Sequence, residues 1–247
     1  MPTVIRLIWR FDHEVSFEYL DHLGRTLKEL SESVEGFWQA ASMGTLPYSL
    51  VAESRTDQLY RRISVELSNI NGWIDWTSGI GIDGILKTED FLNITRTTSS
   101  ILGVTKVKRF NRAGIRFIMV CDKTVKLDRA EWTRSAIADN TYDMTTRLLG
   151  SISDIGLIFE GSDTDMLLYR VHFGPNDRNS LDRLLGGSFS PEAMVAFSDH
   201  PLIFDLDLYE NAIATAGFSF ARWASTKLEK AQKFADAWEK ASRVEAR

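Results

Sequence analysis

The pair Asp205 and Asp207 has the most suggestive chemistry in this sequence, because it places two carboxylates two residues apart within a predicted strand. Alternate residues of a strand point to the same face, so both could bind Mg²⁺ and support metal-dependent hydrolysis. Asp12 and Glu14, just past the first predicted strand, could supply further ligands. Carboxylates on a solvated strand face are also common, and two residues do not make a metal site. We therefore expect no metal, no cofactor and no catalytic residue at this pair.

Other catalytic and nucleotide-binding patterns are absent or incomplete in the sequence. The 4 histidines include no pair at the i, i+4 spacing of helical zinc sites, and no G-x-S-x-G nucleophile motif occurs. Gly79, Gly81 and Gly84 match G-x-G-x-x-G, but polar residues precede them where a dinucleotide-binding fold has a buried strand. Cys121 follows an apolar run and is expected to be a small core residue. Together these observations favour a protein that is not an enzyme.

The basic run KVKRFNRAGIR at residues 106–116 could bind the phosphate groups of RNA or DNA. Its cations are Lys106, Lys108, Arg109, Arg112 and Arg116. Arg61 and Arg62, on a strand predicted nearby, could extend this stripe. The run lacks the aromatic pattern of RNA-recognition strands, and acidic residues elsewhere could pair with its bases. Nucleic-acid binding is therefore the alternative interpretation rather than the leading one.

Aromatic residues indicate an interaction surface. The chain contains 7 Trp, 14 Phe and 6 Tyr. Trp73 and Trp76 lie in the segment 69–84, whose glycine, asparagine and aspartate content predicts a loop or insertion. Phe234 and Trp238 lie near the end of a long amphipathic helical pattern. Because aromatic side chains commonly anchor protein interfaces, these four residues are the predicted contacts with a protein partner or a second copy of the chain.

The composition is that of an ordinary globular protein. The 247 residues are 44% hydrophobic and 26% charged, with a net charge of −5, and an acidic chain is a poor default nucleic-acid binder. A single cysteine gives no disulfide framework and fits a reducing compartment. There is no signal-peptide pattern, and no apolar run approaches the roughly 20 residues of a membrane helix. We expect a cytoplasmic protein that does not enter membranes.

Strand patterns alternate with helical patterns along the chain. The predicted strands cover residues 4–11, 48–53, 58–67, 104–110, 115–121, 155–160, 166–173 and 202–209. The predicted helices cover residues 16–36, 88–102, part of 127–149, 179–185 and 191–197, and a long helix follows Gly217. If the strand at 115–121 opens a second unit, both parts read β-α-β-β-α-β, the order of a ferredoxin-like unit. We therefore predict an α+β fold of two ferredoxin-like halves, 1–112 and 113–247, which could also form one continuous domain, with the long C-terminal helix added.

Residues 109–118, RFNRAGIRFI, resemble a segment of a family of uncharacterised, sporadically distributed bacterial proteins of about this length. The matching positions of its R-x-G-[LI]-R-[YF] strand are Arg112, Gly114, Ile115, Arg116 and Phe117. The family is similar also in a D-x-D strand, here Asp205 and Asp207, followed by a long C-terminal helix. An Asn of the family's strand is replaced here by Met119 or Val120. The resemblance implies no activity, cofactor or catalytic residue, and the family's patchy distribution suits an accessory role in a mobile-element or phage-defence system.

The sequence thus predicts a non-enzymatic interaction or regulatory subunit of a bacterial complex, which acts through a protein partner or self-association. RNA or DNA binding through residues 106–116 is the alternative function. Metal-dependent hydrolysis at Asp205 and Asp207 is a third hypothesis, from a different class.

Overall fold

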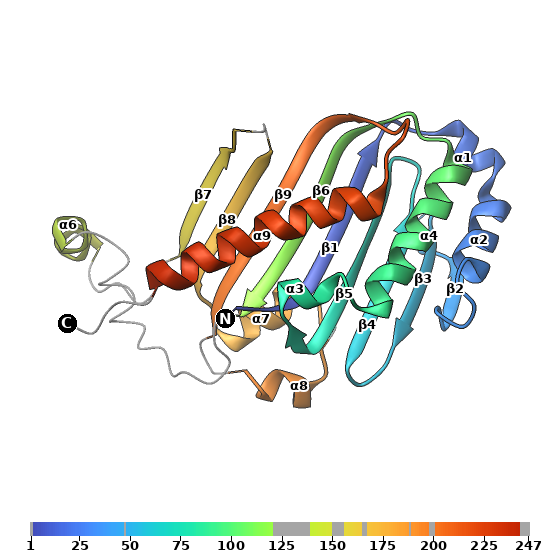
Figure 1. Cartoon of the computed structure of the whole chain (residues 1–247). Helices are drawn as coiled ribbons and strands as arrows, with labels where there is room; N and C mark the ends of the chain where they lie inside the picture. Colours follow the sequence, from blue (N-terminus) through green and yellow to red (C-terminus); the bar gives the residue numbers. More distant parts are fainter. Residues whose placement is uncertain are drawn as a thin grey trace.

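One antiparallel sheet organises the chain in the computed structural model, which describes residues 2–46, 48–120, 139–149, 156–164, 167–187, 189–197 and 201–242. The sheet has nine strands in the order β2-β3-β4-β5-β1-β6-β9-β8-β7 (Figure 1). In chain order the strands are β1 (Thr3–His13), β2 (Ala40–Met43), β3 (Leu50–Arg55), β4 (Leu59–Val65), β5 (Asn69–Ile80), β6 (Arg109–Val120), β7 (Leu157–Ser162), β8 (Leu168–Pro175) and β9 (Leu202–Ala214). All eight neighbouring pairs run antiparallel.

The two parts of the sheet follow the same path. After β1 the chain crosses to the edge strand β2 and returns strand by strand through β3 and β4 to β5, which pairs with β1. After β6 it crosses to the opposite edge strand β7 and returns through β8 to β9, which pairs with β6. The pairing of β1 with β6 joins the two parts at the centre of the sheet.

Helices cover the two faces of the sheet unequally. The described helices are α1 (Phe17–Asp21), α2 (Leu23–Glu32), α3 (Ile82–Ile85), α4 (Glu89–Thr105), α6 (Asp139–Leu149), α7 (Arg178–Leu184), α8 (Pro191–Val195) and α9 (Phe220–Ser242). The long helix α9 crosses one face and packs beside α3 and α4, while α2 packs against α4 (Figure 1). We call this side the helix-covered face and the other side the open face.

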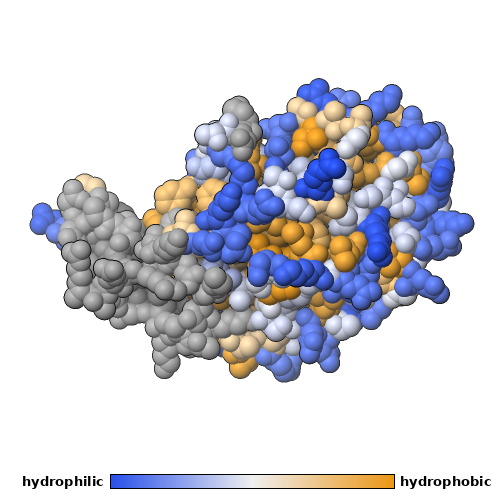
Figure 2. Space-filling model, in the orientation of Figure 1, coloured by the Kyte–Doolittle hydropathy of each residue, from blue (hydrophilic) through white to orange (hydrophobic). Residues whose placement is uncertain are grey.

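The main hydrophobic core lies between the helix-covered face and its helices. Leu7, Trp9 and Phe11 alternate along β1 and are all fully buried there. Phe220 of α9 lies 6.0 Å from the ring of Trp9 and 5.5 Å from that of Phe11. Seen from outside, this side shows hydrophobic side chains among hydrophilic ones over its centre (Figure 2). Burying such large rings stabilises the placement of α9 across the sheet.

A smaller core lies on the open face, where α7 and α8 cover one end of the central strands. Ile5, Ile118 and Ile203 of β1, β6 and β9 pack there with Leu181 of α7 and Phe197 beyond α8. A shift of register between Val4 and Arg6 marks a β-bulge in β1. Such a bulge re-aims neighbouring side chains, so that both Ile5 and Arg6 serve the open face.

The prediction of two ferredoxin-like halves is wrong, because the strands form one continuous nine-stranded sheet. Residues 69–80 form the full-length strand β5 where the pattern predicts a loop, and the predicted loop before residue 48 contains β2. The two strands predicted at 104–110 and 115–121 are one strand, β6, since α4 continues to Thr105. The predicted division between residues 112 and 113 falls within β6.

The predicted helix starts near residues 16, 88 and 191 are confirmed. Ser16 caps α1 by accepting a hydrogen bond from the amide of Tyr19, and Thr88 caps α4 in the same way. Pro191 stands in the first turn of α8. The predicted helix over 16–36 is interrupted at His22, which separates α1 from α2. The prediction for Cys121 lies outside the described residues.

Candidate anion-binding site

A pocket of about 560 Å³ lies on the open face, between strands β1, β3, β4 and β5 and the end of α7. Five arginines line it: Arg6, Arg10, Arg55, Arg62 and Arg183. Its other polar and aromatic walls are Tyr60, Asn71 and Trp73. We call this site the arginine pocket. Guanidinium groups present paired N–H donors that match phosphate and carboxylate oxygens, so the lining defines an anion-binding site by its chemistry.

Strand register brings these side chains together. On antiparallel strands, residues that lie directly opposite point to the same face and touch across the pair. The opposed pairs on the open face are Arg6 with Asp75, Arg10 with Asn71, Arg62 with Trp73, and Arg55 with Tyr60. The pocket is therefore built on four neighbouring strands, and α7 adds Arg183 from above the sheet.

Arg6 forms the fixed floor of the pocket. Its Nε lies 2.5 Å from Oδ1 of Asp75 and its Nη2 lies 2.7 Å from Oδ2, in a bidentate pair that is almost completely buried. The same guanidinium donates to the carbonyl oxygens of Leu184 at 3.0 Å and Leu185 at 2.6 Å. These carbonyls end α7, so one side chain ties the helix to β1 and β5. Arg6 and the end of α7 are thereby held in place.

Arg62 and Trp73 form the aromatic wall of the pocket. The guanidinium carbon of Arg62 lies 5.2 Å from the Trp73 ring centroid, and that of Arg6 lies 5.9 Å from the same ring. The ion pair of Arg62 with Glu53 is long, at 3.9 Å. The buried Nε of Arg62 and indole Nε1 of Trp73 have no hydrogen-bond partner within the described part of the chain. Burial raises the pKa of the neighbouring Tyr60 hydroxyl, which keeps that group neutral.

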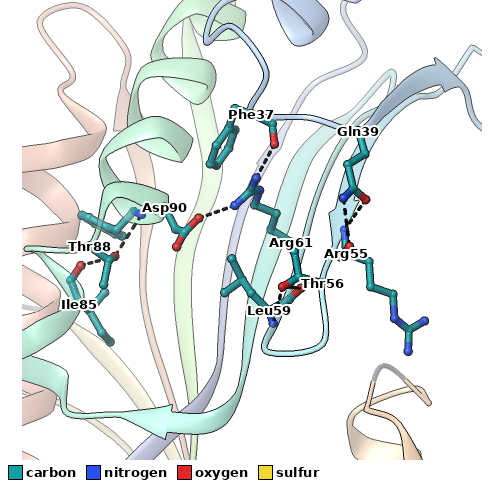
Figure 3. A network of polar contacts seen from close by, with 10 residues as sticks. Phe37, Gln39, Arg55, Thr56, Leu59, Arg61, Ile85, Thr88 and Asp90 are labelled. Atoms are coloured by element: carbon teal, nitrogen blue, oxygen red, sulfur yellow. Dashed lines mark hydrogen bonds and ion pairs between the residues drawn. The ribbon is translucent and has the colours of Figure 1, made fainter.

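Arg10, Arg55 and Arg183 stand at the rim. Arg10 pairs with Asp12 at 2.6 Å in an exposed contact, a type that contributes little to stability. The backbone of Arg55 is fixed by the Gln39 amide, which accepts from its N–H at 2.9 Å and donates to its carbonyl at 3.1 Å. Beyond this contact the Arg55 side chain extends away from Gln39 (Figure 3). Arg183 donates to Ser180 at 3.0 Å.

The pocket is more positive than its surroundings. Among the described residues, Asp75, Asp12 and Glu53 form ion pairs with Arg6, Arg10 and Arg62, and Asp177 interacts electrostatically with Arg183. The whole chain carries a net charge of −5, so positive charge is concentrated at this place. A local excess of one sign in a concave site raises the local concentration of oppositely charged ligands.

A second hollow of about 860 Å³ adjoins the arginine pocket between the β3–β4 turn and α8, and we call it the α8 groove. Arg55 and Tyr60 line both hollows. The rest of the α8 groove is different in kind: it contains hydroxyl, carboxylate and apolar side chains and no further arginine or lysine. The two hollows adjoin at Arg55 and Tyr60, and we call them together the recess, which has a cationic end and an uncharged-to-acidic end.

The predicted basic run is divided by the structure. Arg112 pairs with Asp207 at 2.6 Å, and Arg116 pairs with Asp205 through two contacts of 2.7 and 2.5 Å. The hydrogen bonds to Asp205 raise the pKa of Arg116 above its ordinary value. Burial raises the pKa of Asp207 despite the two arginines beside it.

The other three cations of that run, Lys106, Lys108 and Arg109, lie elsewhere. They are exposed around a hollow of about 380 Å³ at the start of β6, near His13 and Phe17. Arg61, predicted to extend the run, points to the helix-covered face instead. There it pairs with Asp90 and donates to the carbonyl of Phe37 (Figure 3).

The predicted interface aromatics lie in different environments. Trp73 lines the arginine pocket, whereas Trp76, on the opposite face of β5, is 7% exposed and belongs to the main core. Phe234 is partly buried, with its ring 5.3 Å from that of Tyr169. Trp238 belongs to α9, and its side chain lies outside the described residues.

Metal and membrane sites have little support in the described part of the chain. Its residues contain no group of three or more His, Cys, Asp or Glu arranged to hold a metal ion. No helix among the described residues has the length and apolar character needed to span a bilayer. In comparisons with known proteins, no family model matches the chain and no curated protein matches it.

The arginine pocket was not predicted from the sequence. The alternation of Arg6 and Arg10 with apolar residues in the first strand is a visible signal of a polar face. The signal does not say which strands flank this one. The convergence with Arg55, Arg62 and Arg183 depends on β5 and on the position of α7, and neither follows from local pattern.

Proposed function

We propose that this protein is a non-enzymatic interaction or regulatory protein that recognises an anionic ligand at the arginine pocket. The observation that carries the proposal is the convergence of five arginines from three strands and one helix in a single pocket. Structural ion pairing alone accounts for Arg6, whose Nε and Nη2 both donate to Asp75. It accounts poorly for Arg62, whose carboxylate contact is long and whose Nε lacks a partner among the described residues.

The rigidity of the floor supports binding rather than mere surface charge. A preformed site loses little conformational entropy when its ligand arrives. Arg6 is held by four hydrogen bonds, and Arg62 rests against the Trp73 ring.

Calorimetric titration with inorganic tripolyphosphate tests this function. We expect binding that weakens as salt rises, because the contacts are ionic. Arg62→Gln should weaken binding about ten-fold or more, the cost of losing a charged hydrogen-bond partner. Arg25→Gln, at an exposed position of α2 that does not line the arginine pocket, is the matched control and should bind as the wild type does. A wild-type chain that binds no tripolyphosphate at low salt contradicts the proposal.

Nucleic-acid binding is the second candidate, and the exposed grouping of Lys106, Lys108 and Arg109 supports it. Each phosphate contact contributes about 0.7 to 0.9 to the slope of log affinity against log salt. Lys106→Glu with Lys108→Glu should therefore weaken single-stranded RNA binding and reduce that slope by about two contacts' worth. Unchanged affinity and slope in the double variant contradict a nucleic-acid site at this end of β6.

A further inference from the structure

The recess on the open face has two chemically different ends, and this difference restricts its ligand. The arginine pocket supplies positive charge at one end, whereas Asp57 and Glu192 stand exposed in the α8 groove at the other. A ligand that is anionic along its whole length, such as a nucleic acid or an acidic peptide, would place negative charge beside these carboxylates. Like charges juxtaposed in an interface weaken binding. The occupant is therefore anionic at one end only.

The size of the recess indicates a small molecule. Ligand pockets typically measure about 300 to 1,000 Å³. The arginine pocket, at about 560 Å³, and the α8 groove, at about 860 Å³, each fall within that range. Arg55 and Tyr60 line both hollows, so one ligand bound against these two side chains can contact both.

The walls of the α8 groove fit a nucleoside. Leu59, Ala193 and Ala196 provide an apolar surface for a planar ring, and the two alanines leave room for it. Hydroxyl groups of Thr77 and Ser78 lie on the same lining. Carboxylates accept hydrogen bonds from ribose hydroxyls in other nucleotide sites, and Asp57 can do so here.

Resting on the proposed anion-binding function, we propose that the ligand is a nucleotide with more than one phosphate. Its phosphates occupy the arginine pocket, and its nucleoside lies in the α8 groove. More than one phosphate is proposed because Arg10, Arg55, Arg62 and Arg183 surround the fixed Arg6, and the charge of several guanidinium groups matches that of several phosphates. The proposal concerns recognition and includes no chemical step.

Calorimetric titration with the four ribonucleoside triphosphates, with inorganic tripolyphosphate and with free nucleosides tests the assignment. At least one triphosphate should bind ten-fold or more tightly than tripolyphosphate, and the nucleosides should bind far more weakly. Arg62→Gln should weaken both phosphate ligands. Ala196→Trp fills the α8 groove from an exposed position and should reduce nucleotide affinity to that of tripolyphosphate while leaving tripolyphosphate binding unchanged. Val195→Trp, at a 69% exposed position that does not line the groove, is the matched control and should have no effect.

The outcomes separate the two proposals. If nucleotides and tripolyphosphate bind equally and both depend on Arg62, the nucleotide assignment is overturned and the anion-binding function stands. If Ala196→Trp leaves nucleotide affinity unchanged, the placement of the nucleoside in the α8 groove is overturned. If no phosphate compound binds, both proposals fail. Thermal unfolding of each variant shows whether it remains folded, and Arg10→Gln replaces Arg62→Gln if the latter does not.

Discussion

Arg116 of β6 and Asp205 of β9 form a bidentate ion pair across the sheet, with Nε–Oδ1 and Nη2–Oδ2 distances of 2.7 and 2.5 Å. In the sequence these residues belong to two separate hypotheses, a phosphate-binding stripe and a metal-binding pair. In the structure each compensates the charge of the other, and Arg112 and Asp207 do the same beside them. The arginines of β6 are thus paired with carboxylates of β9, whereas those of the arginine pocket come from β1, β3, β4 and α7.

Replacing Asp205 with Asn should lower the free energy of unfolding by about 2 kcal/mol, because Arg116 loses a charged partner in a partly buried contact. Asp205 itself is 8% exposed. The double variant Asp205→Asn with Arg116→Gln should lose less free energy of unfolding than the two single variants lose in sum, since neither charge is then left unpaired. Urea denaturation of the wild type, the two single variants and the double variant measures this coupling.

The exposed pair Arg170–Glu160 provides the control for that experiment. Its two side chains are 58% and 64% exposed. Glu160→Gln should change stability by less than about 1 kcal/mol. Strictly additive effects of the Asp205 and Arg116 changes would show that the buried pair contributes no coupling.

The pattern of residues 69–84 predicts a loop, and the reason it fails lies in tertiary structure. Gly72 lies in the middle of β5, opposite Trp9 on one neighbouring strand and Ile63 on the other. A side chain there would meet the Trp9 ring at 2.3 Å and the carbonyl oxygen of Arg62 at 2.7 Å. Glycine is thus required by the close approach of Trp9 and not by a turn. A local sequence pattern cannot distinguish a glycine at a close contact from a glycine at a turn. The alternation of apolar residues in β1 and the apolar stripe of α9, in contrast, predict a strand and a helix correctly.

Gly72→Ala should destabilise the protein by about 1 to 3 kcal/mol, the usual cost of inserting atoms into a packed core. The Trp9 ring would have to move, and the nearby backbone oxygen cannot yield as a flexible side chain would. Gly103→Ala is the control, because a β-carbon there meets nothing within 4 Å and glycine is the poorer helix former. Thermal or urea unfolding compares the two variants. A Gly72→Ala protein as stable as the wild type would contradict the packing described for Trp9.

The candidate site shows a second limit of sequence reasoning. Its members lie between residues 6 and 183, and they meet because β5 separates β4 from β1 and because Arg6 holds the end of α7. A basic run such as 106–116 is easily noticed because its members are adjacent in the chain. In the structure Lys106 and Lys108 precede β6 and are exposed, whereas Arg112 and Arg116 lie within the strand and pair with Asp207 and Asp205.

The buried Tyr19 hydroxyl should make the stability of the protein fall in alkaline conditions. This hydroxyl lies 2.7 Å from the carbonyl oxygen of Tyr48 and 3.0 Å from that of Val65. Burial, and secondarily Glu66, raises the pKa of Tyr19 well above its ordinary value. Above about pH 10 the unfolded chain loses this proton while the folded protein retains it, so stability falls as pH rises. The contribution is at most about 1.4 kcal/mol per pH unit for one group.

Tyr19→Phe should therefore make the alkaline fall in stability shallower, although it removes a hydrogen bond and lowers stability at neutral pH. Urea midpoints measured from about pH 8 to about pH 11 for both proteins give the two slopes. Parallel curves over that range would show that the proton of Tyr19 is not retained in the folded state.

Disrupting the buried pair Arg6–Asp75 should have the largest effect on stability. Asp75→Asn leaves the guanidinium of Arg6 without its carboxylate in a site where the two side chains are 9% and 1% exposed. Breaking such a pair from one side costs about 3 to 5 kcal/mol. Asp12→Asn removes the carboxylate of the exposed pair with Arg10 and should cost less than about 1 kcal/mol. Urea denaturation compares the two variants.

The same change should also loosen α7, because Arg6 donates to the carbonyls of Leu184 and Leu185 from an orientation that Asp75 fixes. We expect faster hydrogen exchange at amides of residues 181–187 in Asp75→Asn than in Asp12→Asn, and a parallel loss of tripolyphosphate binding, since α7 supplies one wall of the arginine pocket. Unchanged exchange in this segment would mean that Leu181 and Leu185 hold α7 through apolar packing alone. The ion pair would then stabilise the sheet without fixing the position of α7, and apolar packing in the smaller core would hold this wall of the arginine pocket in place.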